Sequence, residues 1–118
     1  GRRMGFPTAN IEPADSLKLV PRAGVYAVRV ALEGGSRLMD GMMNIGTRPT
    51  FDGTGTTLEV NIFGFNGDLY GQTLTVMFVD KLRDERKFPS VKRLMEQLEE
   101  DRREAEKRLN PPQPSQME

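Results

Sequence analysis

The stretch GVYAVRVAL, residues 24–32, alternates large apolar side chains with small or polar ones. Successive side chains of a strand point to opposite faces, so Tyr26, Val28 and Val30 share one face with Leu32. Alanines and one arginine occupy the positions between them. The pattern predicts a β-strand whose large apolar side chains lie on one face, with Ala27, Arg29 and Ala31 on the other.

Further strands with turns between them are predicted along the rest of the chain. Gly34-Gly35 supplies a turn, and a loop rich in Gly, Pro and Thr is predicted over 47–56. The other predicted strands cover residues 37–45, 57–65 and 74–82. A short strand within 4–11 is a further candidate. Several strands with short connections and no βαβ spacing predict a mainly β, antiparallel barrel or sandwich.

One helix is expected after the strands. Pro89-Ser90 opens it with Ser90 as N-cap, and an apolar stripe follows that is interrupted at Arg102. The stripe consists of Val91, Leu94, Met95, Leu98, Ala105 and Leu109. The charged residues between them are interpreted as a solvated face. The proline-rich segment 110–118 cannot continue the helix and is predicted to be a disordered tail.

Composition excludes several classes of function. The chain has 118 residues, with 17 Lys plus Arg against 17 Asp plus Glu, and neither Cys nor His. Balanced charge favours neither nucleic acid nor an anionic membrane as partner, and no apolar run approaches the roughly 20 residues of a membrane span. Without His or Cys, Ser-His hydrolysis, thiol catalysis and a soft zinc site are excluded. Catalysis would depend on carboxylates, hydroxyls, Lys, Arg and a hard cation.

The first candidate site is Gly5-Phe6-Pro7-Thr8-Ala9-Asn10. If this segment is extended, Thr8 and Asn10 project to the same side, because they are two residues apart. A hydroxyl and an amide oxygen are neutral hard ligands, suited to Mg²⁺ whose shell is completed by phosphate oxygens. The alternative is an ordinary Asx or Ser/Thr turn, which is the commoner role of such a motif.

The second candidate is Glu59. Strand alternation places it opposite the Leu58, Val60 face. In a chain without histidine, a carboxylate is the natural general base for an alcohol proton. The alternative is a solvent-facing strand carboxylate without function, which is the more frequent case.

Four further motifs, in this order and spacing, are highly specific together. They are Met43–Phe51 (MNIGTRPTF), Leu58–Phe65 (LEVNIFGF), Asp68–Gly71 (DLYG) and Lys81–Phe88 (KLRDERKF). With the opening motif they resemble the riboflavin kinase domain of bacterial bifunctional riboflavin kinase/FMN adenylyltransferases (FAD synthetases). The resemblance runs from residue 1 to about 109, and it implies a six-stranded Greek-key-like barrel with one C-terminal helix.

The resemblance also implies a chemistry: transfer of the ATP γ-phosphate to the ribityl 5′-hydroxyl of riboflavin, giving FMN. Glu59 matches the catalytic base of the family. Gly5, Pro7, Thr8 and Asn10 match its nucleotide motif, with Thr8 and Asn10 also holding Mg²⁺.

Asn44 and Arg83 are expected to bind substrate, because segments matching 44–50 and 81–88 help close the site in the family. Arg83 is equally plausible as a surface ion-pair residue. In the parent proteins an adenylyltransferase domain lies on the N-terminal side. A cytoplasmic location is expected, with no nucleic acid or membrane partner.

One departure concerns the family's first strand, which lies before the position of Gly1. Without it, the fragment is expected to be weakened or to take a strand from a neighbouring chain, because unpaired strand edges are exposed. Two other functions remain open on the residues alone: a non-catalytic barrel that binds flavin or nucleotide, and a structural barrel with no ligand.

Overall fold

The computed structural model describes residues 9–10, 21–35, 37–65, 67 and 69–111. They form one antiparallel sheet of five strands and one helix. The elements are β1 (Ala9–Asn10), β2 (Gly24–Leu32), β3 (Leu38–Thr50), β4 (Gly53–Ile62), β5 (Leu74–Arg83) and α1 (Val91–Leu109). The strands predicted over 24–32 and 74–82 are confirmed, and so is the helix.

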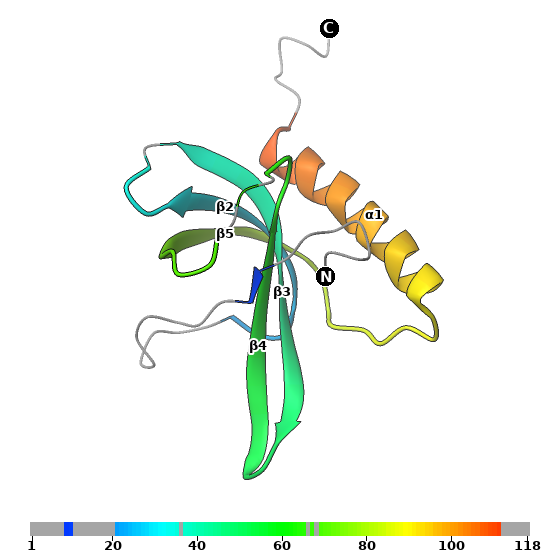
Figure 1. Cartoon of the computed structure of the whole chain (residues 1–118). Helices are drawn as coiled ribbons and strands as arrows, with labels where there is room; N and C mark the ends of the chain where they lie inside the picture. Colours follow the sequence, from blue (N-terminus) through cyan, green and yellow to red (C-terminus); the bar gives the residue numbers. More distant parts are fainter. Residues whose placement is uncertain (1–8, 11–20, 36, 66, 68, 112–118) are drawn as a thin grey trace, which may run out of the picture.

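The strand order is β1-β4-β3-β2-β5 (Figure 1). Strands β2, β3 and β4 follow one another as hairpins, and β5 returns to pair with β2. This arrangement is a Greek key. The mainly β, antiparallel class is therefore confirmed, while β1 and β5 remain the edges of the sheet in the part of the chain that is described.

One face of the sheet carries the apolar core. Its buried members are Tyr26, Val28, Val30, Met43, Ile45, Leu58, Val60 and Ile62. They alternate along β2, β3 and β4 as the period of a strand requires, so the prediction that Tyr26, Val28 and Val30 share one face is confirmed. Leu32, Leu74 and Val76 pack at the border of this cluster.

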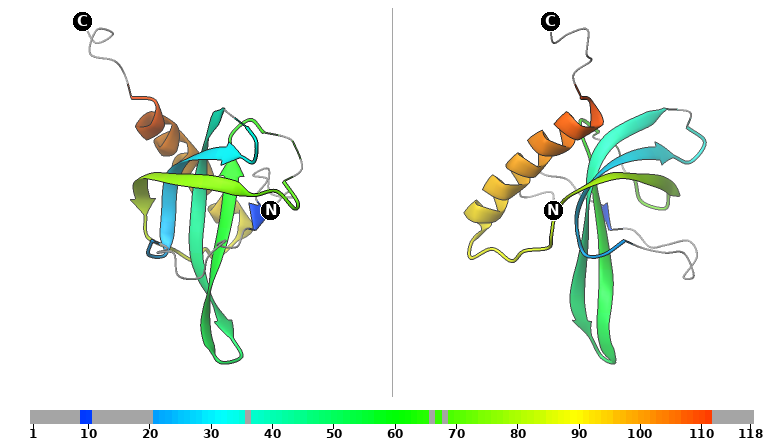
Figure 2. Two further views of the ribbon diagram at one scale, coloured as in Figure 1. Left: turned by 90° about the vertical axis from the view of Figure 1, so that its left-hand side faces the viewer. Right: turned by 180° about the vertical axis from the view of Figure 1, so that it is seen from behind.

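The other face is covered by α1 (Figure 2). Ala27 of β2 and Ala105 of α1 are fully buried together with Leu109, and these small side chains let the helix approach the strands closely. Ser90 caps α1 as predicted, accepting a hydrogen bond from the Arg93 backbone N–H at 3.2 Å. Val91 departs from the predicted stripe, being 63% exposed, because the first turn of α1 lies away from the sheet (Figure 1).

The prediction of a loop over residues 47–56 was wrong. Strands β3 and β4 stay paired from Gly46 opposite Thr57 as far as Thr50 opposite Gly53. This two-stranded arm projects beyond the rest of the sheet (Figure 1). Its turn-forming residues satisfy their backbone groups across the arm, which overrides their local preference for a loop.

The third predicted strand ends earlier than expected, at Ile62 rather than residue 65. The Phe65 N–H donates to the Ile62 carbonyl and closes a turn, in which Gly64 has φ +74°. A positive φ of this kind favours glycine, so the turn and the end of β4 are both explained by Gly64.

The helix ends at Leu109, just before Pro111 and Pro112, as the proline-rich segment predicted. Asn110 lies in the predicted tail, but its N–H donates to the Glu106 carbonyl and its side-chain amide donates to Asp40 at 2.8 Å. Residues 112–118, which make up most of that tail, lie outside the described residues.

Candidate functional site

A single row of paired positions crosses the sheet through four of the predicted site residues. Asn10 on β1 pairs with Glu59 on β4, and Glu59 pairs with Asn44 on β3. Asn44 pairs in turn with Val25 on β2, and Val25 with Arg83 on β5. Residues far apart in the sequence are thus neighbours in space, because directly opposed residues lie about 4.5–5.5 Å apart.

This row belongs to the face that α1 covers. Val25 is two residues from Ala27, which packs against α1, and Glu59 is opposite in orientation to the core residues Leu58 and Val60. The predicted orientation of Glu59 is therefore confirmed. Glu59 is half-buried, and its cross-strand neighbour Asn44 is exposed, so this part of the row is reached by solvent.

The opening motif is only partly described. Gly5, Pro7 and Thr8 lie outside the described residues, and Asn10 is placed by its backbone alone. The short strand predicted within 4–11 is confirmed at Ala9–Asn10. No group of three or more carboxylates that could hold a metal occurs in the described part of the chain.

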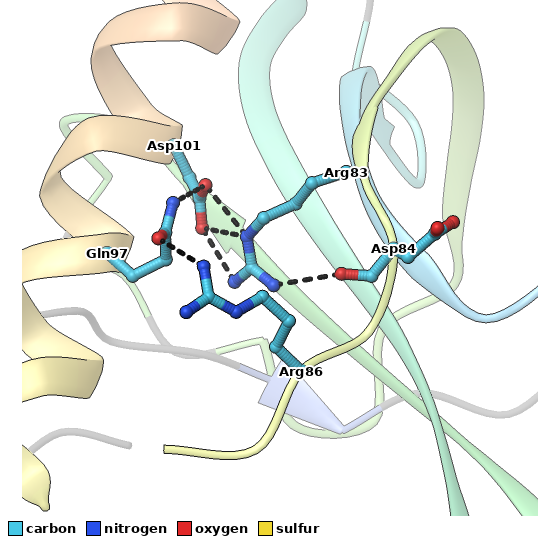
Figure 3. A network of polar contacts seen from close by, with 5 residues as sticks. All are labelled: Arg83, Asp84, Arg86, Gln97 and Asp101. Atoms are coloured by element: carbon cyan, nitrogen blue, oxygen red, sulfur yellow. Dashed lines mark hydrogen bonds and ion pairs between the residues drawn. The ribbon is translucent and has the colours of Figure 1, made fainter. Parts of the chain in front are cut away.

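Arg83 makes a bidentate ion pair with Asp101 of α1. Its Nε donates to Asp101 Oδ1 at 2.9 Å, and its Nη2 donates to Oδ2 at 2.8 Å (Figure 3). The two side chains are only 16% and 4% exposed, so the pair is largely buried rather than at the surface. Arg83 therefore fastens β5 to α1, and its predicted substrate role stays a prediction.

The same carboxylate organises a wider network. Gln97 donates to Asp101 at 3.0 Å and accepts from Arg86 Nη1 at 3.1 Å (Figure 3). The guanidinium groups of Arg83 and Arg86 both lie over the ring of Phe88, at 5.5 and 5.0 Å. Through these contacts α1 holds the connection that leads into it from β5.

Asp101 was not predicted as a site residue, because the charged residues of the helix were interpreted as a solvated face. A signal was present: the apolar stripe is interrupted near Arg102, and Asp101 lies three residues after Leu98 and four before Ala105. Those spacings place Asp101 on the stripe itself. A carboxylate in a buried stripe indicates a buried cation opposite it.

A second missed contact joins the β5–α1 connection to β3. Glu85 accepts hydrogen bonds from the Thr47 backbone N–H at 3.1 Å and from Thr47 Oγ1 at 3.4 Å. Next to it, the Lys81 ammonium lies 2.6 Å from Asp84 and lowers the pKa of that carboxyl group by hydrogen bonding and charge. The Glu85 contact joins the residues just after β5 to β3, whereas the Lys81–Asp84 pair is local, between residues three apart at the end of β5.

A recess of about 400 Å³ lies between α1 and the end of β5. Its lining residues are Leu82, Arg83, Gln97, Glu100, Asp101, Arg103, Glu104 and Lys107. The walls are mostly charged, whereas sites for flat organic ligands are mostly apolar, and neither Glu59 nor Asn44 lines it. We therefore place the candidate site at the row through Glu59 and not in this recess.

A family model and several known proteins match most of this chain. The family model for riboflavin kinase matches residues 1–109. A bifunctional riboflavin kinase/FMN adenylyltransferase of Bacillus subtilis is 42% identical over 108 residues, covering 89% of this chain and 33% of the relative. The corresponding protein of Haemophilus influenzae is 46% identical over 101 residues, covering 86% of this chain and 32% of the relative.

Among solved structures, a chain described as a macrolide-efflux protein from Streptococcus pneumoniae superposes with a TM-score of 0.82 at 40% identity. That match covers 90% of this chain and 34% of the other. The chain thus spans about a third of the length of the relatives it matches. Within the described residues, α1 is too polar to cross a membrane.

Proposed function

The chain belongs to the riboflavin kinase family, and from that premise we propose that it transfers the ATP γ-phosphate to the 5′-hydroxyl of riboflavin to give FMN. The observation that carries the proposal is the row across the sheet, in which Glu59 lies between Asn10 and Asn44. A predicted nucleotide residue, a candidate base and a predicted substrate residue are adjacent there.

Glu59 is proposed to accept the proton of the ribityl 5′-hydroxyl as the new P–O bond forms. Phosphoryl transfer needs little covalent help from the protein, and it depends on an aligned hydroxyl and on neutralised phosphate charge. A half-buried carboxylate on a rigid central strand suits the first requirement, because its position is fixed by pairing on both sides. Asn44 is proposed to orient the flavin beside it.

Thr8 and Asn10 are proposed to hold Mg²⁺ together with the nucleotide, and Gly5 and Pro7 to shape the same segment. The metal supplies charge neutralisation of the phosphates when it is bound. Asn10 contributes by its register opposite Glu59, which brings the nucleotide motif to the strand that carries the base. The finer role of each residue rests on the family resemblance together with this register.

The wider setting of the chain is also a proposal. The relatives are named for two activities, and this chain spans about a third of their length. We propose that an adenylyltransferase domain accompanies it in the parent protein and converts the FMN product onward. A cytoplasmic location is proposed on the same basis, with no nucleic acid or membrane partner.

The test is formation of FMN from riboflavin and ATP, with and without Mg²⁺. Glu59→Gln is expected to lower kcat by about 10²–10⁴ while flavin binding, measured by fluorescence quenching, stays nearly intact. Glu33→Gln, in the exposed turn after β2, is the matched control and should keep full activity.

Two results would count against the proposal. A Glu59→Gln protein with wild-type kcat would remove Glu59 from the mechanism. A wild-type chain that quenches flavin fluorescence but forms no FMN, alone or extended upstream, would favour the non-catalytic binding barrel instead.

A further inference from the structure

The connection 84–90 is attached to both of the layers that it joins. Just before it, Arg83 makes an ion pair with Asp101 of α1. Within it, Arg86 donates a hydrogen bond to Gln97 of the same helix. Between them, Glu85 reaches in the other direction and accepts two hydrogen bonds from Thr47 on β3. The connection therefore spans from the helix to the β3–β4 arm.

The contact of Glu85 lies beside the candidate site. Gly46 and Thr57 form the pair next to Asn44 and Glu59 on the same face, two residues along each strand. That spacing is about 7 Å along the strands. The Glu85 carboxylate is thus seated one pair away from the proposed base.

The position of the Glu85 carboxylate depends on the absence of a side chain at Gly46. A Cβ added at Gly46 would lie 2.8 Å from Glu85 Oε2 and 2.9 Å from Thr57 Oγ1. Such distances are closer than side-chain atoms tolerate, so a larger residue at position 46 would force the Glu85 carboxylate and the Thr57 hydroxyl, both ends of flexible side chains, to shift. Gly46 thus provides space for Glu85, and substituting it is a way to dislodge Glu85 without changing Glu85 itself.

We propose that Glu85 is a positioning residue: by binding Thr47 in the space above Gly46, it holds the 84–90 connection against the sheet next to Glu59, and so sets the affinity for the flavin. The inference rests on the proposed function for its consequence, but the contact itself can be tested without any turnover. Both hydrogen bonds are exposed to solvent, so losing them is expected to change an equilibrium constant by about 2- to 10-fold.

The first experiment measures opening of the connection directly. Trypsin cleaves after Arg86 and Lys87, which are exposed, but a protease needs the segment to open locally. Glu85→Ala and Gly46→Ala are expected to speed this cleavage by about 2- to 10-fold. Glu85→Gln keeps an acceptor oxygen for the Thr47 N–H and should cleave near the wild-type rate, as should the exposed helix control Glu99→Ala.

The second experiment separates positioning from catalysis. Glu85→Ala is expected to raise KM for riboflavin, or Kd by fluorescence quenching, by about three- to tenfold, with kcat changed by less than about twofold. Glu85→Gln should restore the wild-type KM. Thr47→Val, which loses only Oγ1 and keeps the backbone donor, should give a smaller rise and serves if Gly46→Ala does not fold.

The results of the two experiments distinguish a positioning role of Glu85 from a purely structural role and from a catalytic one. Unchanged cleavage in Glu85→Ala overturns the proposal, and so does faster cleavage with unchanged KM and Kd, which would make the contact purely structural. A Glu85→Gln protein as impaired in kcat as Glu59→Gln would show that the charge acts in the chemistry, which also overturns it. If the wild type makes no FMN, the proposed function fails, yet cleavage and flavin Kd still test Glu85.

Discussion

The two faces of the sheet differ in what their side chains do, although the same strands build both. The core face is a continuous apolar cluster through β2, β3 and β4. The α1 face has a small apolar contact at Ala27 and Ala105, and around it lie ion pairs, amides and Glu59. Adjacent residues of one strand therefore serve different ends, and stability and function can be separated by single substitutions.

The physical reason lies in how each face is covered. A polar group on the core face would lose its contacts with water, so apolar side chains dominate that face, and the Tyr26 hydroxyl there donates to the Arg22 carbonyl at 2.6 Å. On the other face, the buried residues of α1 fall in its C-terminal half, at Asp101, Ala105 and Leu109. The exposed Asn44 lies on this face too, which leaves room for polar groups beside a substrate.

The largest expected effect contrasts two neighbours on β4. Glu59→Gln should reduce kcat by about 10²–10⁴, while the free energy of unfolding changes less than it does in Val60→Ala, because Glu59 lies outside the apolar core. Val60→Ala, on the core face, should do the reverse, costing about 2–3 kcal/mol of stability because a cavity forms where the side chain is 1% exposed. Urea denaturation and an FMN assay measure both; equal losses of stability would break the distinction between the faces.

Asp101→Ala should have the next largest effect. It leaves the mostly buried guanidinium of Arg83 without its carboxylate, and breaking such a pair costs about 3–5 kcal/mol. A double variant, Arg83→Met with Asp101→Leu, should recover most of that loss, because no unpaired charge remains. A recovery in stability without recovery of activity would show that Arg83 also acts on substrate, whereas an Asp101→Ala protein of wild-type stability would refute the buried pair.

Ser90→Ala tests the point where the α1 face begins. The side chain caps the helix through the Arg93 N–H, so its loss should reduce stability by about 1 kcal/mol in urea denaturation. Ser90→Asp should retain the cap. Wild-type stability in Ser90→Ala would show that the cap contributes nothing to the helix.

The smallest effect concerns pH. Lys81 lowers the pKa of Asp84 in the folded chain below the ordinary 3.8, mainly through their hydrogen bond. A depressed pKa contributes stability that is complete above the unfolded pKa and is lost as pH falls through the folded pKa. The difference in stability between wild type and Asp84→Asn should therefore be constant above about pH 5 and shrink below it, and it should also shrink in 1 M salt. A difference that grows on acidification would contradict this.

Much of this could be predicted from the sequence because strand alternation is local. The strand over 24–32, the orientation of Glu59, the Ser90 cap and the family all follow from residue patterns that tertiary contacts left unchanged. The arm at 47–56 could not be predicted in this way, because its Gly, Pro and Thr residues favour loops and only pairing across the arm makes them strands. Glu85 and Asp101 were missed for a related reason: their partners lie 38 and 18 residues away in the sequence.

The order of residues alone thus determined the antiparallel β class, the single helix and the residue types available for phosphoryl transfer, since periodicity and composition are properties of the chain. Tertiary structure decided which of those residues meet. Register across β1, β4 and β3 set Asn10, Glu59 and Asn44 in one row. Packing of α1 decided that Arg83 pairs with Asp101, because a buried charge needs a partner that only the folded chain can bring to it.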